Sequence, residues 1–239
     1  MGTSGARRAP TTRLWRLAKA AATRYLSPES GGAVDAREVV VRYVAALGEG
    51  DGTGPTGALA AFRQTRRAAQ NLGAFCCQAD SRGWPAALED WGLQALAGDG
   101  SEVLTPALSV ALETPGGGLE QAVAHTAMMR VLQNLPVAPS QGERPARLVR
   151  RFLVEAFGLR LVLDLGESLE AAASGISPLR QGLTGLAAWI DRASILPNLP
   201  RSPLTPDAWL GLPGWTWVTS LLTELILNLT DQNSPPKIC

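Results

Sequence analysis

Few side chains in this 239-residue sequence have the types and spacing that catalysis requires. His125 is the only histidine, so a nucleophilic serine or cysteine site would have to use it. Its neighbours on a predicted helix, Met128 and Met129 among them, contain no recognisable catalytic triad. Because a single helical histidine is more often structural than catalytic, we predict that His125 has no catalytic role.

The cysteines supply neither a metal site nor a disulfide framework. Cys76 and Cys77 are neighbours that rarely bridge each other, and Cys239 makes the total odd. A vicinal pair and one histidine cannot provide the ligand set of a zinc site. No glycine-rich segment is followed by Lys-Ser or Lys-Thr, which excludes a P-loop. No pair of acidic residues at i, i+3 or i+4 is predicted to lie on an inward face, so no ligand set for metal-assisted hydrolysis is visible. The sequence therefore predicts a protein that is not an enzyme and that binds no metal or cofactor.

The charge balance narrows the choice of partners. Basic and acidic residues number 22 and 21, so the net charge of +1 excludes a globally basic nucleic-acid binder but permits a local basic patch. The N-terminus lacks the apolar region of a secretory signal. The most apolar stretch, residues 209–229, is interrupted by Pro213, Gly214 and Glu224 and is not a membrane span. We expect a soluble, cytoplasmic protein in a reducing compartment.

Two predicted helices carry arginine-rich faces. In residues 11–26, and again from about residue 58 to 79, apolar residues recur at helical spacing while basic residues fall on the opposite side. Such faces are usually solvated, but they also suit the phosphate groups of nucleic acid. The candidate nucleic-acid or phosphate contacts are Arg13, Arg16, Lys19, Arg63, Arg66 and Arg67.

The last predicted helix, residues 215–229, has an almost continuous apolar stripe. Such a stripe is either buried in the core of its own chain, which is the usual arrangement, or offered to a partner protein. In the second case the partner surface would comprise Trp215, Trp217, Leu221, Leu225 and Leu229.

Helical periodicity runs through the chain, which predicts an all-α, multi-helix bundle of about 8–9 helices. Residues 159–165 alternate like a strand, but no partner strand is visible, so we predict a helix and leave the strand open. Asp35, three residues before Glu38, is the predicted N-cap of the second helix. Residues 48–57 are predicted to be a glycine-rich loop, residues 84–96 a helix, and Thr105-Pro106 the start of another helix, with proline at its first position. A polar, proline-bearing connector at residues 136–145 suggests a boundary. The predicted organisation is a flexible N-terminal arm (1–10), an N-terminal helical bundle (11–135), a C-terminal helical subdomain (146–229) and a disordered tail (230–239).

The N-terminal arm contains one group with distinctive chemistry. Met1 precedes the small residue Gly2, so its removal leaves a free glycine amine. An α-amine titrates close to neutral pH, which keeps a useful fraction neutral and nucleophilic. N-myristoylation is not expected, because Ala6 stands where that signal needs Ser or Thr. Gly2 is therefore a candidate modification site, and a merely disordered terminus is the alternative.

The start Met1-Gly2-Thr3-Ser4, followed by an arm and an all-helical body rich in Ala, Gly and Arg, resembles the QatB component of the four-gene Qat antiphage systems of bacteria. The resemblance implies a non-catalytic companion that works through protein–protein interaction with a P-loop ATPase, a QueC-like enzyme and a TatD-type nuclease. It also implies that Gly2 accepts a deazaguanine-type modification from the QueC-like enzyme. A nucleic-acid-binding helical module that uses the arginine-rich faces is the alternative.

Overall fold

The computed structural model describes residues 12–27, 34–50, 54–96, 101–113, 118–133, 144–195, 203 and 205–231. Within these residues the secondary structure consists of ten α-helices and short 3-10 helices, with no strand. The predicted all-α fold is confirmed. The predicted arm at residues 1–10 and residues 232–239 of the predicted tail lie outside the described residues.

The chain divides into two compact units, each built from segments that are distant in sequence. The first unit combines Met1–Ala58, Leu161–Ala193 and Leu229–Cys239, and the second combines Leu59–Arg160 and Ser194–Asn228. Helix α7 (Arg144–Ala172) contributes residues to both units. The boundary predicted at residues 136–145 falls largely outside the described residues and stays a prediction.

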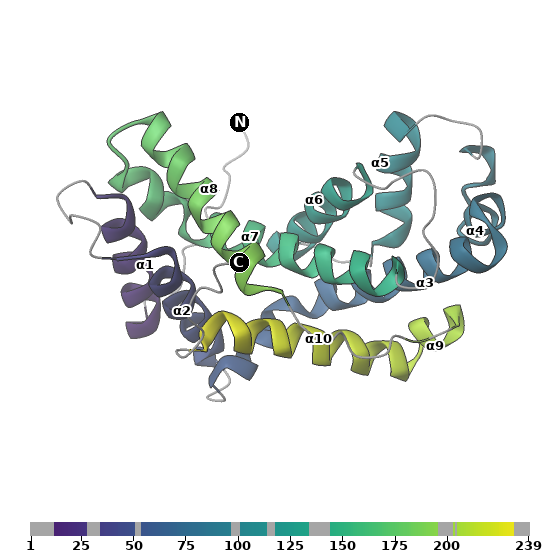
Figure 1. The fold of residues 1–239 in the computed structure, drawn as a ribbon, viewed down its shortest axis with the longest axis horizontal. Coiled ribbons are helices and arrows are strands. Elements are labelled where there is room, and N and C mark those ends of the chain that lie inside the picture. Colours follow the sequence, from purple (N-terminus) through teal and green to yellow (C-terminus); the bar gives the residue numbers. More distant parts are fainter. Residues whose placement is uncertain are drawn as a thin grey trace. The chain divides into compact units, whose positions relative to one another are not determined.

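In the first unit, α1 (Arg13–Leu26) packs against α2 (Ala36–Leu47) and α8 (Ile176–Ala193) (Figure 1). The buried face of α1 places the Trp15 ring edge-on to the Tyr43 ring, with centroids 5.9 Å apart. The Asp35 carboxylate accepts a 2.8 Å hydrogen bond from the backbone N–H of Glu38, which confirms the predicted N-cap of α2.

Helix α8 approaches α1 closely because it presents a glycine at the contact. The Tyr25 hydroxyl donates a 3.1 Å hydrogen bond to the carbonyl oxygen of Gly182, and a Cβ on that glycine would overlap the Leu26 side chain. Burial, and secondarily the charge of Asp35, raises the pKa of Tyr25 above its usual value.

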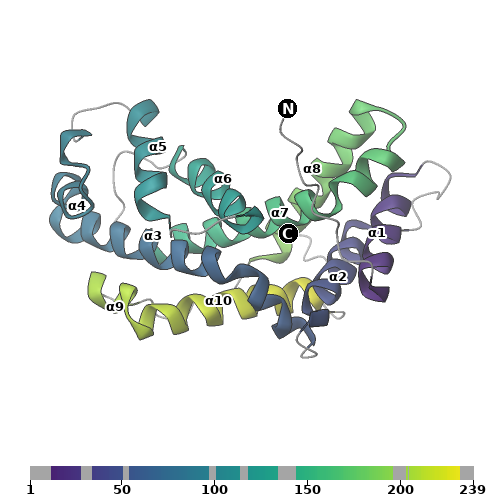
Figure 2. The same cartoon turned by 180° about the vertical axis from the view of Figure 1, so that it is seen from behind.

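The second unit is organised around α3 (Arg63–Arg82), which packs against α4 (Trp84–Asp90), α5 (Ser101–Leu112), α6 (Leu119–Gln133) and α9 (Pro206–Leu210). Helix α10 (Leu212–Thr230) runs beside α3, as both Figure 1 and Figure 2 show. Aromatic pairs fill the core: Phe62 stacks on Phe157 at 6.0 Å, and Phe75 meets Trp84 edge-on at 5.2 Å.

Gly73 lets the short helix α9 sit directly on α3. The fully buried Trp209 ring occupies the space that a Cβ on Gly73 would need. The side-chain amide of Gln70, one turn before Gly73, donates 3.0 Å hydrogen bonds to the carbonyl oxygens of Trp209 and Gly211. These contacts fix the segment that leads into α10.

Several predicted helix limits differ from the structure. A 3-10 helix (Gly54–Phe62) precedes α3 where we expected a loop up to residue 57. The helix expected over residues 84–96 ends at Asp90, because Gly92 takes a positive φ of 71° that few other residues adopt. Residues 159–165 lie within α7, so the helix prediction is confirmed and the strand alternative is wrong.

The start of α5 is a further correction. We expected Thr105-Pro106 to open this helix, because proline is favoured at the first helical position. The helix instead begins at Ser101 and contains Pro106 in its interior.

Candidate functional site

Three arginines of α3 and one tryptophan of α10 form an arginine–tryptophan cluster (Arg63, Arg66, Arg67 and Trp215). The guanidinium carbons of Arg66 and Arg67 lie 4.3 and 5.2 Å from the centroid of the Trp215 ring, a cation–π arrangement. Arg66 also donates a 3.0 Å hydrogen bond to the Thr219 hydroxyl and longer ones to the carbonyl oxygens of Phe62 and Leu59.

The three arginines of this cluster have different surroundings. Burial lowers the pKa of Arg66 below its usual value; the Glu120 carboxylate opposes this shift, and the Arg63 charge adds to it. Arg63 and Arg67 are exposed, and neither forms an ion pair with any residue that the structure describes. Arg66 therefore joins α3 to α10, whereas Arg63 and Arg67 have their charges open to solvent.

The second set of predicted contacts lies on α1, in the first unit. Arg13 and Arg16 are exposed and Lys19 is half-buried. Over the described ranges, none of the three pairs with a carboxylate. Arg13 and Arg16 lie on the side of the helix away from the buried Trp15 and Ala18, whereas Lys19 lies at the edge of the buried face.

The apolar stripe of α10 faces the interior. Trp217, Leu221, Leu225 and Leu229 are each at most 7% exposed, and only Trp215 in this set is partly open to solvent. The Trp217 ring meets Trp209 edge-on, with centroids 5.0 Å apart. These four side chains are thus buried within their own chain, which is the first of the two arrangements considered for the stripe.

Sequence reasoning missed a carboxylate–imidazole pair. The Glu113 carboxylate contacts Nδ1 of His125, and the Gln121 side chain donates a 3.4 Å hydrogen bond to the other Glu113 oxygen. A carboxylate can orient an imidazole for acid–base work, but a nucleophile must also be present. In the described part of the chain, His125 has no hydrogen bond to a serine, threonine or cysteine side chain.

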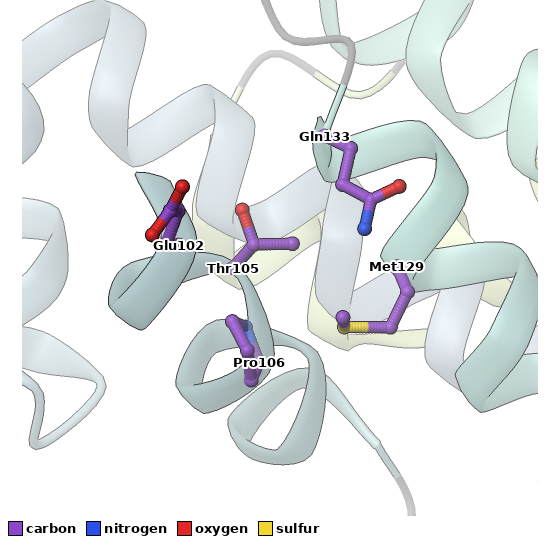
Figure 3. Close-up of a pocket in the computed structure, with 5 residues that line it drawn as sticks. All are labelled: Glu102, Thr105, Pro106, Met129 and Gln133. Carbon is purple, nitrogen blue, oxygen red and sulfur yellow. The ribbon is translucent and has the colours of Figure 1, made fainter. Parts of the chain in front are cut away.

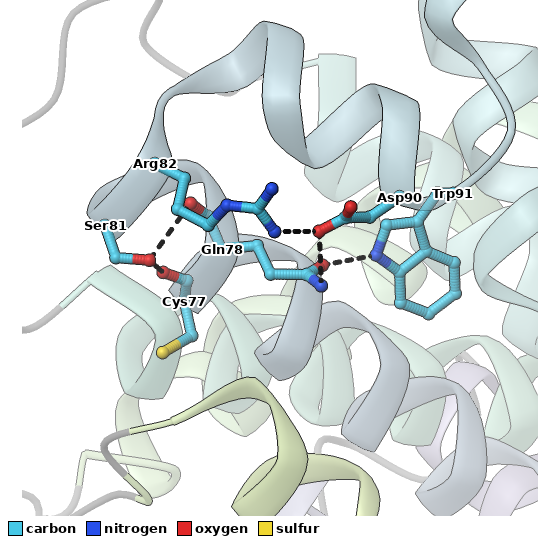
Figure 4. Close-up of polar contacts among 6 residues, drawn as sticks. All are labelled: Cys77, Gln78, Ser81, Arg82, Asp90 and Trp91. Atoms are coloured by element: carbon cyan, nitrogen blue, oxygen red, sulfur yellow. Dashed lines mark hydrogen bonds and ion pairs between the residues drawn. The ribbon is translucent and has the colours of Figure 1, made fainter.

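The vicinal cysteines Cys76 and Cys77 lie on the buried side of α3. Burial, assisted by the charge of Asp80, raises the pKa of Cys77 and so reduces its thiolate fraction. The next turn of the helix holds α4 in place: Gln78 accepts a 2.6 Å hydrogen bond from the Trp91 indole, and Arg82 pairs with Asp90 (Figure 4). These polar contacts are structural.

A pocket of about 130 Å³ lies between α5 and α6 in the second unit. Figure 3 shows Glu102, Thr105 and Pro106 of α5 facing Met129 and Gln133 of α6.

In the ranges that the structure covers, no three His, Cys, Asp or Glu side chains gather as a metal site. Nor does any described helix have the length and apolar character needed to cross a membrane. Gly2, the candidate modification site, lies outside the described residues.

Comparison with known proteins identifies the family of this chain. A family model described as the Qat anti-phage system associated protein QatB matches residues 53–193, which contain α3 to α8 and the pocket. No curated protein and no solved structure matches the chain. The match spans more than half of the 239 residues. The chain therefore belongs to the QatB family of Qat anti-phage system associated proteins.

Proposed function

We propose that this member of the QatB family is a non-catalytic helical companion in a bacterial antiphage defence complex. The observation that carries the proposal is the family match over residues 53–193. Its partners are the other operon-encoded proteins: a P-loop ATPase, a QueC-like enzyme and a TatD-type nuclease. An all-helical body with no metal cluster among its described residues suits a protein that acts through contacts.

Within this role, Gly2 is the acceptor of a deazaguanine-type modification added by the QueC-like enzyme. A glycine α-amine is unhindered, and Thr3, Ser4 and Gly5 keep the neighbouring residues small enough to enter an enzyme pocket. The nucleophile is the neutral amine, which forms a useful minor fraction near neutral pH.

Phage challenge of cells that carry the complete operon tests this role. Gly2→Pro is expected to abolish protection, because it replaces the primary amine with a hindered secondary one. Thr3→Ala leaves the amine unchanged and is the matched control. Full protection with Gly2→Pro would contradict a requirement for the Gly2 amine.

A second candidate function is nucleic-acid binding through the arginine-rich faces. It is favoured by one observation: Arg13, Arg16, Arg63 and Arg67 are exposed and have no carboxylate partner among the described residues. Free charges of this kind bind phosphates and release counterions, so binding should weaken steeply with salt.

Fluorescence anisotropy with labelled DNA and RNA over a series of salt concentrations tests this candidate. Changing Arg63 and Arg67 together to Gln should reduce the salt slope by about 2 if both contact phosphates. Arg82 and Arg130, which already pair with Asp90 and Glu155, provide the matched control pair. No detectable binding at about 50 mM salt would exclude this function.

A further inference from the structure

Helix α5 has an apolar face that no described residue covers. Val103 and Val110 are 52% and 63% exposed, and their spacing of seven residues places them two turns apart on one side of the helix. Pro106, also exposed, lies between them. The opposite side of α5 is already packed, because Leu108 and Leu112 are buried.

The exposed residues on this face do not stabilise the helix itself. Valine loses χ1 freedom in a helix and is a weaker helix former than alanine, lysine, arginine or glutamate. A proline in the interior removes one backbone hydrogen bond. At exposed positions packing does not determine the residue type, so intrinsic helix propensity should. Valine and proline there lower the stability of the helix that contains them. Conflicts of this kind are expected at functional surfaces.

The pocket between α5 and α6 adjoins this face, because Pro106 belongs to both. Pro106 has no N–H, so the carbonyl oxygen of Glu102 receives no helical hydrogen bond from it. The Glu102 carboxylate is exposed and forms no ion pair with any described residue. Met129 provides an apolar wall, as Figure 3 shows. The pocket thus combines the Glu102 carboxylate with a surface suited to an aliphatic chain.

We propose that Val103, Pro106 and Val110, together with this pocket, form a docking face for an amphipathic helix of a partner protein, and that an arginine or lysine of this helix enters the pocket beside Glu102. This inference rests on the proposed companion role. The aliphatic stem of the basic residue packs against Pro106 and Met129 while its charge meets Glu102. Apolar residues of the partner helix at i, i+3 or i+4, and i+7 cover the two valines.

A photo-crosslinking residue identifies the occupant without depending on a disruptive substitution. Benzoylphenylalanine at position 110, in the chain co-expressed with the other operon proteins, should crosslink to a helix of one partner that contains Arg or Lys. The same residue at position 176, where Ile176 is 77% exposed on α8, is the control and should not give that product. The crosslinked peptides are identified by mass spectrometry.

The second measurement is the binding affinity between the purified chain and the purified partner. Charge reversal by Glu102→Lys, and the double change Val103→Asp with Val110→Asp, should each weaken binding about tenfold or more, as expected of anchors at an interface. Glu89→Lys on α4 is the control for charge reversal, because Glu89 is also exposed and without an ion pair among the described residues. Circular dichroism verifies that each variant is folded.

The outcomes separate this inference from the companion role. If a complex forms, but position 110 crosslinks no partner and the variants bind normally, the docking face is wrong and the companion role stands. A crosslink to a second copy of this chain, with a dimer by sedimentation, also overturns the hetero-partner proposal. If no operon protein binds the chain, the companion role and the docking face fail together.

Discussion

At the scale of single residues, two helical glycines have opposite surroundings. A Cβ on Gly73 of α3 would overlap the Trp209 ring, whereas a Cβ on Gly166 of α7 would meet nothing within 4 Å. We predict that Gly73→Ala lowers the free energy of unfolding by about 1–3 kcal/mol, through overpacking. Gly166→Ala should raise it by about 0.5–1 kcal/mol, because alanine is the better helix former. Chemical denaturation measures both, and equal effects of the two substitutions would contradict the close contact of α9 with α3.

The thiol of Cys77 gives a prediction about pH. Its raised pKa means that the thiolate fraction at any given pH is below that of a free cysteine. In a Cys239→Ser variant, reaction with a thiol reagent at pH 8 should therefore be slower in the native protein than in denaturant, and the native rate should rise with pH. Equal native and denatured rates would show that Cys76 and Cys77 are accessible.

The candidate site shows what residue-level sequence reasoning can find. The exposure of Arg63 and Arg67 follows from their place opposite the apolar stripe of α3. The pairing of Glu113 with His125 does not follow from the sequence, because Glu113 comes just after α5, His125 lies on α6, and a glycine-rich segment separates the two. Only helix packing brings them together.

At the scale of elements, the contact between α3 and α10 depends on Arg66. Arg66→Met keeps the aliphatic volume but removes the hydrogen bond to Thr219 and the guanidinium over Trp215. We predict a loss of about 1–2 kcal/mol in the free energy of unfolding, at the lower end for charged hydrogen bonds because Arg66 is only half-buried.

The exposed Arg63 is the matched control for Arg66. Arg63→Met should change the free energy of unfolding by no more than about 0.5 kcal/mol. Thermal and denaturant unfolding of the two variants are compared under the same conditions. A stability loss at Arg63 as large as that at Arg66 would contradict the structural role assigned to Arg66.

The limits of the helices were predictable where a local signal fixed them. The Asp35 cap of α2 is encoded by an acidic residue three positions before Glu38, and it forms as expected. The start of α5 was placed too late, because proline is favoured at the first position of a helix but also occurs further in.

At the scale of the whole molecule, periodicity predicts the all-α class but not the assembly of the units. The first unit joins α1 and α2 to α8, which follows them by more than a hundred residues. Likewise, Arg66 reaches Thr219 across 153 positions of sequence. Contacts at such separations depend on complementary shapes, for which a single sequence carries no periodic signal.

The role proposed for Gly2 is tested most directly by the intact mass of the chain purified from cells that express the complete operon. The predicted result is a mass above that of the chain without Met1, with the added group located on Gly2 in the N-terminal peptide. The increase should disappear when the QueC-like enzyme is omitted. A chain with only the mass of the unmodified polypeptide lacking Met1, in the presence of all operon proteins, would contradict the assignment of Gly2 as the acceptor.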